Sequence, residues 1–212
     1  MSHGQNAQKR RGDDFWSRRF PGAPPRCKYS KHLTHRHERH EGKAIERKAL
    51  SENDEPDGMP VMNKQTLDYI ITAALSLLPE QMDSLEARRM LKAIAYQESS
   101  LEHRRQVRGP ARSYWQFELG GLLGPMRHTA TAHHFARICD ELDYQDVPPE
   151  VIHMAMADND ILACCAARLL LYTLPWPLPI EQDEGWKQYQ EAWRPGKPHP
   201  ERWAAAWWFA ES

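Results

Sequence analysis

The apolar residues of this 212-residue chain recur at helical spacing from about residue 62 onwards, and no segment shows a convincing alternation of apolar and polar residues. In an α-helix, residues three and four apart share a face, so such a stripe marks the side that is buried. A substantial sheet would require strands with a period of two residues. The pattern therefore predicts an all-α domain, which we place at residues 59–212.

Capping residues and helix breakers suggest where these helices begin and end. Asn63 is suited to cap the first helix, and Pro79 is expected to end it. Asp83 is expected to cap a second helix that runs up to Glu98, and the glycine- and proline-rich stretch 103–126 is predicted to be irregular. The residues expected to face inward from the second helix are Leu85, Met90, Leu91 and Ile94. Further helices are predicted at 129–142, 149–157, 159–173, 183–193 and 199–210.

Residues 1–58 differ in composition from the rest of the chain. They carry 13 Lys and Arg against nine Asp and Glu, together with five of the 11 histidines and almost no periodic apolar pattern. Such a segment cannot bury enough apolar surface to offset the entropy of ordering it. We therefore predict a charged, largely irregular extension, joined to the helical domain by a linker around SENDEPDGMP.

The overall composition excludes several classes of protein. The formal net charge of −1 gives no general affinity for nucleic acid. No stretch approaches the roughly 20 apolar residues of a membrane span, and the first residues lack the apolar run of a secretory signal. The four cysteines are few and irregularly spaced, and we interpret them as reduced, small core residues. They are Cys27, Cys139, Cys164 and Cys165.

The residues with the clearest chemical potential lie in the passage AIAYQESSLEHRRQVRGPARSYWQFE, residues 93–118. An apolar helix ends there at Glu98-Ser99, and a polar loop leads to Gln116. A carboxyl group at the C-terminal end of a packed helix is desolvated and faces the negative end of the helix dipole, and both effects favour its protonated form. Glu98 is therefore a candidate general acid at neutral pH.

The same passage resembles the lytic transglycosylases of the goose-lysozyme-like superfamily, whose signature runs E-S … G-A-x-G-L-M-Q. Glu98-Ser99 match the E-S pair, Ala111 matches the alanine of the turn, and Gln116 matches the closing Gln. Pro110 and Ser113 stand where the family has glycine. Tyr114-Trp115 replace Leu-Met, and the A-Y-N-A-G-P motif is absent. Residues 158–171 and 189–203 are similar to later parts of the family, the second to phage-encoded members.

This resemblance implies a lysozyme-like fold and a peptidoglycan lytic transglycosylase. In that reaction one Glu, here Glu98, protonates the bond between N-acetylmuramic acid and N-acetylglucosamine, then takes the proton of the muramic C6 hydroxyl and so closes a 1,6-anhydro ring. It also implies a phage virion protein that acts on the cell envelope, without a signal peptide, a metal or a cofactor. The residues nominated for substrate contact are Ser99, Tyr114, Trp115, Gln116 and Tyr189. Tyr189 occupies the place of the family's A-Y-N tyrosine.

Each nominated residue also has a structural interpretation. Gln116 can tie the loop to the backbone, Ser99 can be a helix-end residue, and Tyr114 and Trp115 can pack the loop. The tryptophans between residues 176 and 208 can close the hydrophobic core instead of contacting sugar. The other nearby carboxylates have no setting comparable to that of Glu98. Glu102 and Glu118 lie in charged stretches, and Asp158 and Asp160 suit a helix start.

Residues 1–58 carry a histidine cluster with metal-like spacing, namely His32, His35, His37 and His40, with Cys27 close by. Zinc sites require preorganised ligands, which a segment with so few core residues does not supply. We instead expect the extension to be a solvated basic segment that docks on a partner, such as another virion protein, or on nucleic acid. Its aromatic residues favour docking over simple solvation.

Three other functions stay open. A structural virion protein could keep the lysozyme-like fold without activity, as the departures at Pro110 and Ser113 suggest. A hydrolase such as a chitinase could combine Glu98 with a second carboxylate as base. A glycan-binding module could use the tryptophan-rich end of the chain.

Overall fold

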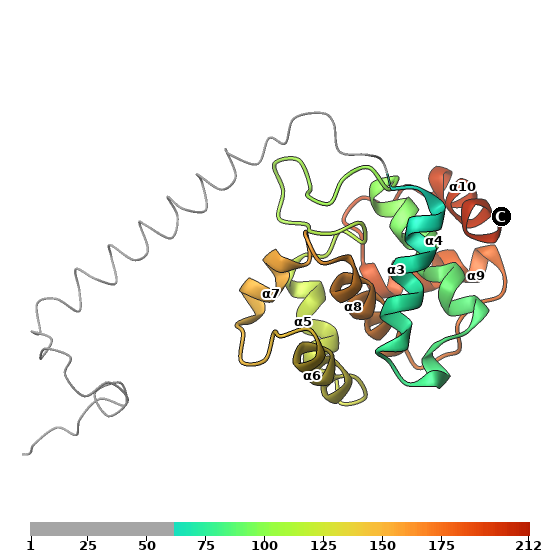
Figure 1. The fold of residues 1–212 in the computed structure, drawn as a ribbon. Coiled ribbons are helices and arrows are strands. Elements are labelled where there is room, and N and C mark those ends of the chain that lie inside the picture. Colours follow the sequence, from blue (N-terminus) through green and yellow to red (C-terminus); the bar gives the residue numbers. More distant parts are fainter. Residues whose placement is uncertain (1–61) are drawn as a thin grey trace, which may run out of the picture. The chain divides into compact units, whose positions relative to one another are not determined.

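The computed structural model describes residues 62–212, and every regular element in that range is a helix (Figure 1). In chain order these are α3 (Lys64–Ser76), the short 3-10 helix η1 (Glu80–Met82), α4 (Leu85–Ser99), α5 (Leu119–Arg127), α6 (Ala132–Glu141), α7 (Pro149–Ala155), α8 (Asp160–Tyr172), α9 (Gln182–Trp193) and α10 (Pro200–Glu211). The all-α fold class is thus confirmed for these residues. None of the helices is long and apolar enough to cross a membrane. The predicted boundary at residue 58 lies outside the described part of the chain.

Helix α8 forms the centre of the domain and lies between α3 and α5 (Figure 1). Ten consecutive residues, 162–171, are buried, which is the pattern of a helix surrounded by neighbours on every side. The side chain of Asn159 accepts a hydrogen bond from the backbone N–H of Leu162 and so fixes where the helix begins. Such a cap contributes about 1 kcal/mol. Cys164 and Cys165 are buried free thiols, in agreement with the prediction of small core residues.

Helix α4 begins one residue later than predicted. Ser84, not Asp83, is its N-cap, and Asp83 forms an ion pair with Arg88 at 2.6 Å. The prediction that Leu85 faces inward is wrong, because its side chain is 77% exposed. At 100° per residue, Leu85 lies opposite Ile94, which is in the middle of the buried face.

Helix α5 corrects the prediction that residues 103–126 are irregular. Its sequence LGGLLGPMR is rich in glycine, yet it packs against α6, α7 and α8 with Leu122 fully buried. A Cβ added to Gly124 would stand 3.5 Å from the side chain of Leu170 on α8. The glycines therefore lower the helix propensity of the segment but allow α5 to lie close to α8, and the packing outweighs the propensity.

Helices α9 and α10 bring the aromatic residues of the C-terminal third together. Tyr189 stacks on Trp203 with ring centroids 5.3 Å apart, and Trp203 packs against Trp207. Gly185 makes this approach possible, since a Cβ there would stand 2.4 Å from the Trp207 ring. Trp203 and Trp207 are buried, as expected if they close the core. Trp208, by contrast, is 71% exposed.

The long connection between α4 and α5 forms one wall of the candidate site. Two isolated bridges, Arg105 with Arg112 and Arg112 with Phe117, fold it back on itself. The guanidinium of Arg104 holds Asp160 at the start of α8 through two hydrogen bonds of 3.2 and 2.7 Å, so the loop is anchored to the central helix. A planar guanidinium suits a two-point contact with a carboxylate.

Candidate active site

Glu98 lies in the last turn of α4, where the buried interior of the helix gives way to a cleft. Ala95, three residues earlier, is fully buried, whereas Glu98 itself is half-buried. The helix ends because Ser100 and Leu101 both adopt left-handed backbone angles, with φ of 51° and 62°. The carboxyl group is thus held at the C-terminal end of a packed helix, as the sequence predicted.

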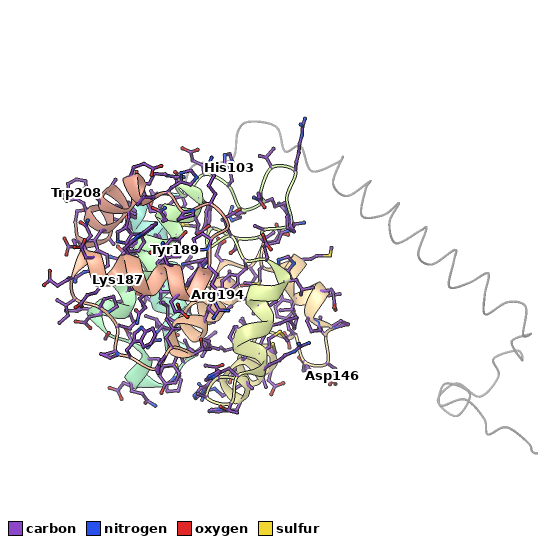
Figure 2. The ribbon with its side chains drawn as sticks, turned by 180° about the vertical axis from the view of Figure 1, so that it is seen from behind. His103, Asp146, Lys187, Tyr189, Arg194 and Trp208 are labelled. Atoms are coloured by element: carbon purple, nitrogen blue, oxygen red, sulfur yellow. The ribbon has the colours of Figure 1, made fainter. Side chains whose placement is uncertain are left out.

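The hydroxyl of Tyr189, on α9, donates a hydrogen bond of 2.6 Å to Oε1 of Glu98. Tyr189 is only 3% exposed and its ring is held between neighbouring aromatic residues, so its hydroxyl has little freedom to turn away. Figure 2 shows Tyr189 on α9 and Arg194 at the end of the same helix. Tyr189 is thus buried and holds the candidate acid, which corrects its nomination as a substrate-contacting residue.

The environment raises the pKa of Glu98 from its ordinary value of 4.5 to about 7. Burial is the main cause, and the hydrogen bond from Tyr189 and the positive charge of Arg202 act in the opposite direction. The negative end of α4 also disfavours the anion. A large fraction of Glu98 therefore keeps its proton at neutral pH, which is the state that a general acid requires.

A cavity of about 880 Å³ opens in front of this carboxyl group. It is lined mainly by the end of α4, the loop that follows, the end of α9, the residues after it and the first turn of α10. The nominated residues Glu98, Ser99 and Gln116 line it, and Trp193 and Phe117 supply aromatic surface. A cleft of this size with convergent polar groups and one carboxyl of raised pKa is a candidate binding and catalytic site.

Gln116 lies in the cavity wall but uses its amide nitrogen on the protein itself. It donates to the carbonyl oxygens of Ser113 at 2.7 Å and His103 at 3.1 Å. Its backbone is left-handed, with φ of 48°, and so is that of Ser113 at 66°. These are costly angles for residues other than glycine, about 1–2 kcal/mol each. The structure thus gives Gln116 the loop-tying role that was left open, at the edge of the cavity.

Ser99 also lines the cavity, and its hydroxyl bonds within the helix end. Oγ donates to the carbonyl of Ala95 at 2.9 Å and accepts from the backbone N–H of Leu101 at 3.2 Å. These bonds stabilise the sharp turn after Glu98. The helix-end interpretation of Ser99 accounts for the contacts that its hydroxyl makes.

Tyr114 and Trp115 do not line the cavity, which corrects their nomination as sugar-contacting residues. Their exposed fractions are 2% and 0%, and the indole nitrogen of Trp115 donates to the carbonyl of Leu91 on α4 at 3.0 Å. The loop turns both rings into the core, where their apolar surface is removed from water and the indole N–H of Trp115 keeps a hydrogen-bond partner. Both residues therefore pack the loop against the core.

Trp193 takes the place in the cleft that sequence reasoning gave to other aromatic residues. It is half-buried, lines the cavity, and its indole nitrogen donates to the carbonyl of Trp115 at 2.9 Å. Its ring also packs against Phe117. The spacing of Tyr189 and Trp193, four residues apart on one helix face, was the available signal.

Arg202 and Ser100 also line the cavity, and no sequence signal points to either of them. Nη2 of Arg202, in the first turn of α10, donates to Oγ of Ser100 at 2.6 Å. An arginine on the surface of an amphipathic helix carries no local mark that separates it from solvated arginines. Only the packing of α10 along α4 brings it near Glu98.

The other carboxylates are distributed in two groups. Glu102 and Glu118 both line the cavity and are exposed. Asp160 lies in the first turn of α8 and pairs with Arg104, and Asp158 pairs with Arg105, as expected of structural residues at a helix start. Glu102 and Glu118 are thus two further carboxylates at the cleft, and their exposure agrees with the prediction that they lie in charged, solvated stretches.

No cluster of three or more His, Cys, Asp or Glu residues able to hold a metal ion occurs between residues 62 and 212. The histidine cluster His32–His40 and Cys27 lie outside the described residues, as does the predicted docking segment.

Comparison of the chain with protein-family models, curated proteins and solved structures gave no match.

Proposed function

We propose that the chain is a peptidoglycan lytic transglycosylase in which Glu98 acts as both acid and base. The observation that carries the proposal is the half-buried carboxyl of Glu98, with its pKa raised to about 7, which lines a cleft of about 880 Å³. A group with a pKa near the working pH can give up a proton and take one back within the same turnover. The resemblance of residues 93–118 to the family supports the same reaction.

The proposed reaction uses the two protonation states of Glu98 in turn. Its proton moves to the glycosidic oxygen, the bond from that oxygen to the muramic C1 breaks, and positive charge develops on the ring. The carboxylate then removes the proton of the C6 hydroxyl, whose oxygen bonds to C1 and closes the anhydro ring. Glu98 ends the cycle protonated, so the reaction consumes no water and requires no second carboxylate.

The cleft offers surfaces suited to an amino-sugar polymer. The half-buried ring of Trp193 presents an aromatic face, on which the apolar face of a sugar ring can stack. The residues lining the cavity include the cations Arg194, Lys197 and Arg202, whose charges suit the carboxylates of peptidoglycan.

Digestion of purified peptidoglycan by the wild-type chain and by Glu98→Gln tests the proposal, with mass spectrometry of the products. We expect wild type to release anhydro-muropeptides, which lack one water relative to hydrolysis products. Loss of this proton donor should reduce the rate by roughly two to four orders of magnitude. Equal rates in wild type and Glu98→Gln would refute the role of Glu98. Absence of cleavage by both would favour an inactive structural protein.

A hydrolase is the second candidate, because Glu102 and Glu118 line the same cavity as Glu98. In a hydrolase, one of these carboxylates would serve as the base or nucleophile that the transglycosylase does not need. Glu102→Gln and Glu118→Gln are the discriminating variants. Reducing-end products from wild type, lost in either variant, would replace the transglycosylase with a hydrolase.

We place the activity in a phage particle because residues 189–203 resemble phage-encoded members of the family. In this proposal residues 1–58 dock on other virion proteins and the helical domain reaches the cell wall during genome entry. Detection of the chain by mass spectrometry in purified particles, and its loss when residues 1–58 are deleted, are the expected results. Incorporation of the truncated chain would refute the docking role.

A further inference from the structure

Arg202 occupies a fixed position beside the candidate acid. It is half-buried in the first turn of α10, and its Nη2 donates to Oγ of Ser100 at 2.6 Å. Ser100 caps α4 two residues after Glu98, with a left-handed backbone. The hydrogen bond therefore joins the guanidinium to the turn that carries the carboxyl group.

The charges facing Glu98 come from four segments of the chain. Arg202 on α10 and Tyr189 on α9 are the two groups that lower the pKa of Glu98 against the effect of burial. The other ionisable residues that line the cavity are Glu102, His103, Arg105, Glu118, Arg194, Lys197 and His199. Tyr189 is neutral near pH 7, since burial and the neighbouring Glu98 raise the pKa of its hydroxyl further above its ordinary value of 10. Arg202 thus supplies the full positive charge in this pair.

A guanidinium stays positively charged at the pH of the reaction. Its electrostatic effect on Glu98 is therefore constant while Glu98 alternates between its protonated and charged states. Burial and the negative end of α4 both destabilise the anion that proton donation creates. In a partly desolvated site a neighbouring cation offsets that cost more than it would in water. A tightly held cation needs no rearrangement during the reaction.

We propose that Arg202 is a positioning residue of this site, which stabilises the Glu98 carboxylate between donation of its proton and recovery of a proton from the sugar C6 hydroxyl. The inference rests on the proposed function for its catalytic part. The electrostatic coupling of Arg202 to Glu98 rests on the hydrogen bond that holds Arg202 at the turn after Glu98 and on the cavity that both residues line, and it is measured without substrate.

The test compares Arg202→Gln with Arg202→Lys in the full chain. Gln removes the charge but keeps an amide donor near Ser100, whereas Lys keeps the charge. Carbon NMR of the Glu98 carboxyl, assigned with Glu98→Gln, gives its pKa directly. We expect a rise of about one pH unit in Arg202→Gln and less than about a third of that rise in Arg202→Lys. An unchanged pKa in Arg202→Gln, or an equal rise in both variants, would overturn the coupling.

Activity on peptidoglycan tests the catalytic part. We expect kcat to fall about tenfold in Arg202→Gln with KM nearly unchanged. The alkaline limb of the pH–rate profile should shift to higher pH together with the pKa of Glu98. Recovery of most of kcat in Arg202→Lys distinguishes charge stabilisation from a merely structural hydrogen bond. Equal losses of kcat in Arg202→Gln and Arg202→Lys would overturn the role of the Arg202 charge in catalysis.

Failure of the proposed transglycosylase function can be distinguished from failure of the Arg202 inference. A wild-type chain that cleaves no glycan would refute the proposed function and the catalytic role of Arg202, while the NMR coupling would still be measured. In case Arg202→Gln does not fold by circular dichroism, Ser100→Ala releases the guanidinium without removing it. We then expect a rise of about half a pH unit for Glu98, and an unchanged pKa would count against the inference.

Discussion

The hydroxyl of Tyr189 donates to Oε1 of Glu98 at 2.6 Å, although 91 positions of the chain separate the two residues. This bond joins the end of α4 to α9, and of the two residues only Glu98 lines the cleft. Hydrogen bonds to a carboxylate favour its charged form, so Tyr189 keeps the pKa of Glu98 from rising above about 7.

Replacing Tyr189 by Phe should therefore raise the pKa of Glu98 and slow the reaction. A hydrogen bond to a charged group contributes about 1.5–3 kcal/mol, which corresponds to at least about one pH unit in the pKa. We expect kcat to fall at least about tenfold. The alkaline limb of the pH–rate profile should shift to higher pH by at least about one unit. Rate profiles of wild type and Tyr189→Phe measure both. Tyr69→Phe is the control, since Tyr69 is 73% exposed, and it should match wild type.

The pH dependence of the wild-type reaction should report the same group. If Glu98 must be protonated to act, kcat/KM is constant below its pKa and falls tenfold per pH unit above about 7. Rate measurements from pH 5 to 9 on purified peptidoglycan determine the limb. The limb should be absent from the residual activity of Glu98→Gln, and a wild-type limb near the ordinary pKa of a glutamate would contradict the assignment.

Glu98→Gln should stabilise the fold at alkaline pH. The pKa of Glu98 is 4.5 in its ordinary state and about 7 in the folded chain, so between these values the unfolded chain loses its proton first. The free energy of unfolding therefore falls as pH rises through this window, by about 3 kcal/mol in all. Gln has no charge to bury and retains an acceptor for Tyr189.

We expect Glu98→Gln to match wild type near pH 4 and to exceed it by about 2–3 kcal/mol at pH 8. Urea unfolding at both pH values is the measurement. Glu102→Gln, which changes an exposed carboxylate of the same cleft, is the matched control and should show no such difference. Equal stability of wild type and Glu98→Gln at pH 8 would show that burial does not raise the pKa of Glu98.

Trp193→Leu should weaken glycan binding because its ring is the aromatic surface that α9 presents to the cleft. Loss of a stacking face costs on the order of 1–2 kcal/mol, so we expect KM for soluble glycan strands to rise about tenfold. Trp208→Leu is the control, since Trp208 is exposed but does not line the cavity. A larger rise in KM for Trp208→Leu than for Trp193→Leu would indicate that glycan binds on α10 and not in the cleft.

The helices were largely predictable because their signals are local. Asn63 caps α3 and Asn159 caps α8 through bonds to N–H groups three residues away. Glu98 could be selected for the same reason, since its place at the end of an apolar helix is set by neighbours along the chain. The helix α5 could not be predicted, because its glycines lower the local propensity and only packing against α8 stabilises it.

The sequence by itself determined the all-α class, most helix boundaries and the position of Glu98, because caps, breakers and helical periodicity act within a few residues. The tertiary structure alone decided that Tyr114 and Trp115 are buried, and that Tyr189 and Arg202 reach Glu98. Burial, hydrogen bonds between helices and the field of a charge depend on distance in space. No pattern along the chain records which surface arginine will lie beside the acid.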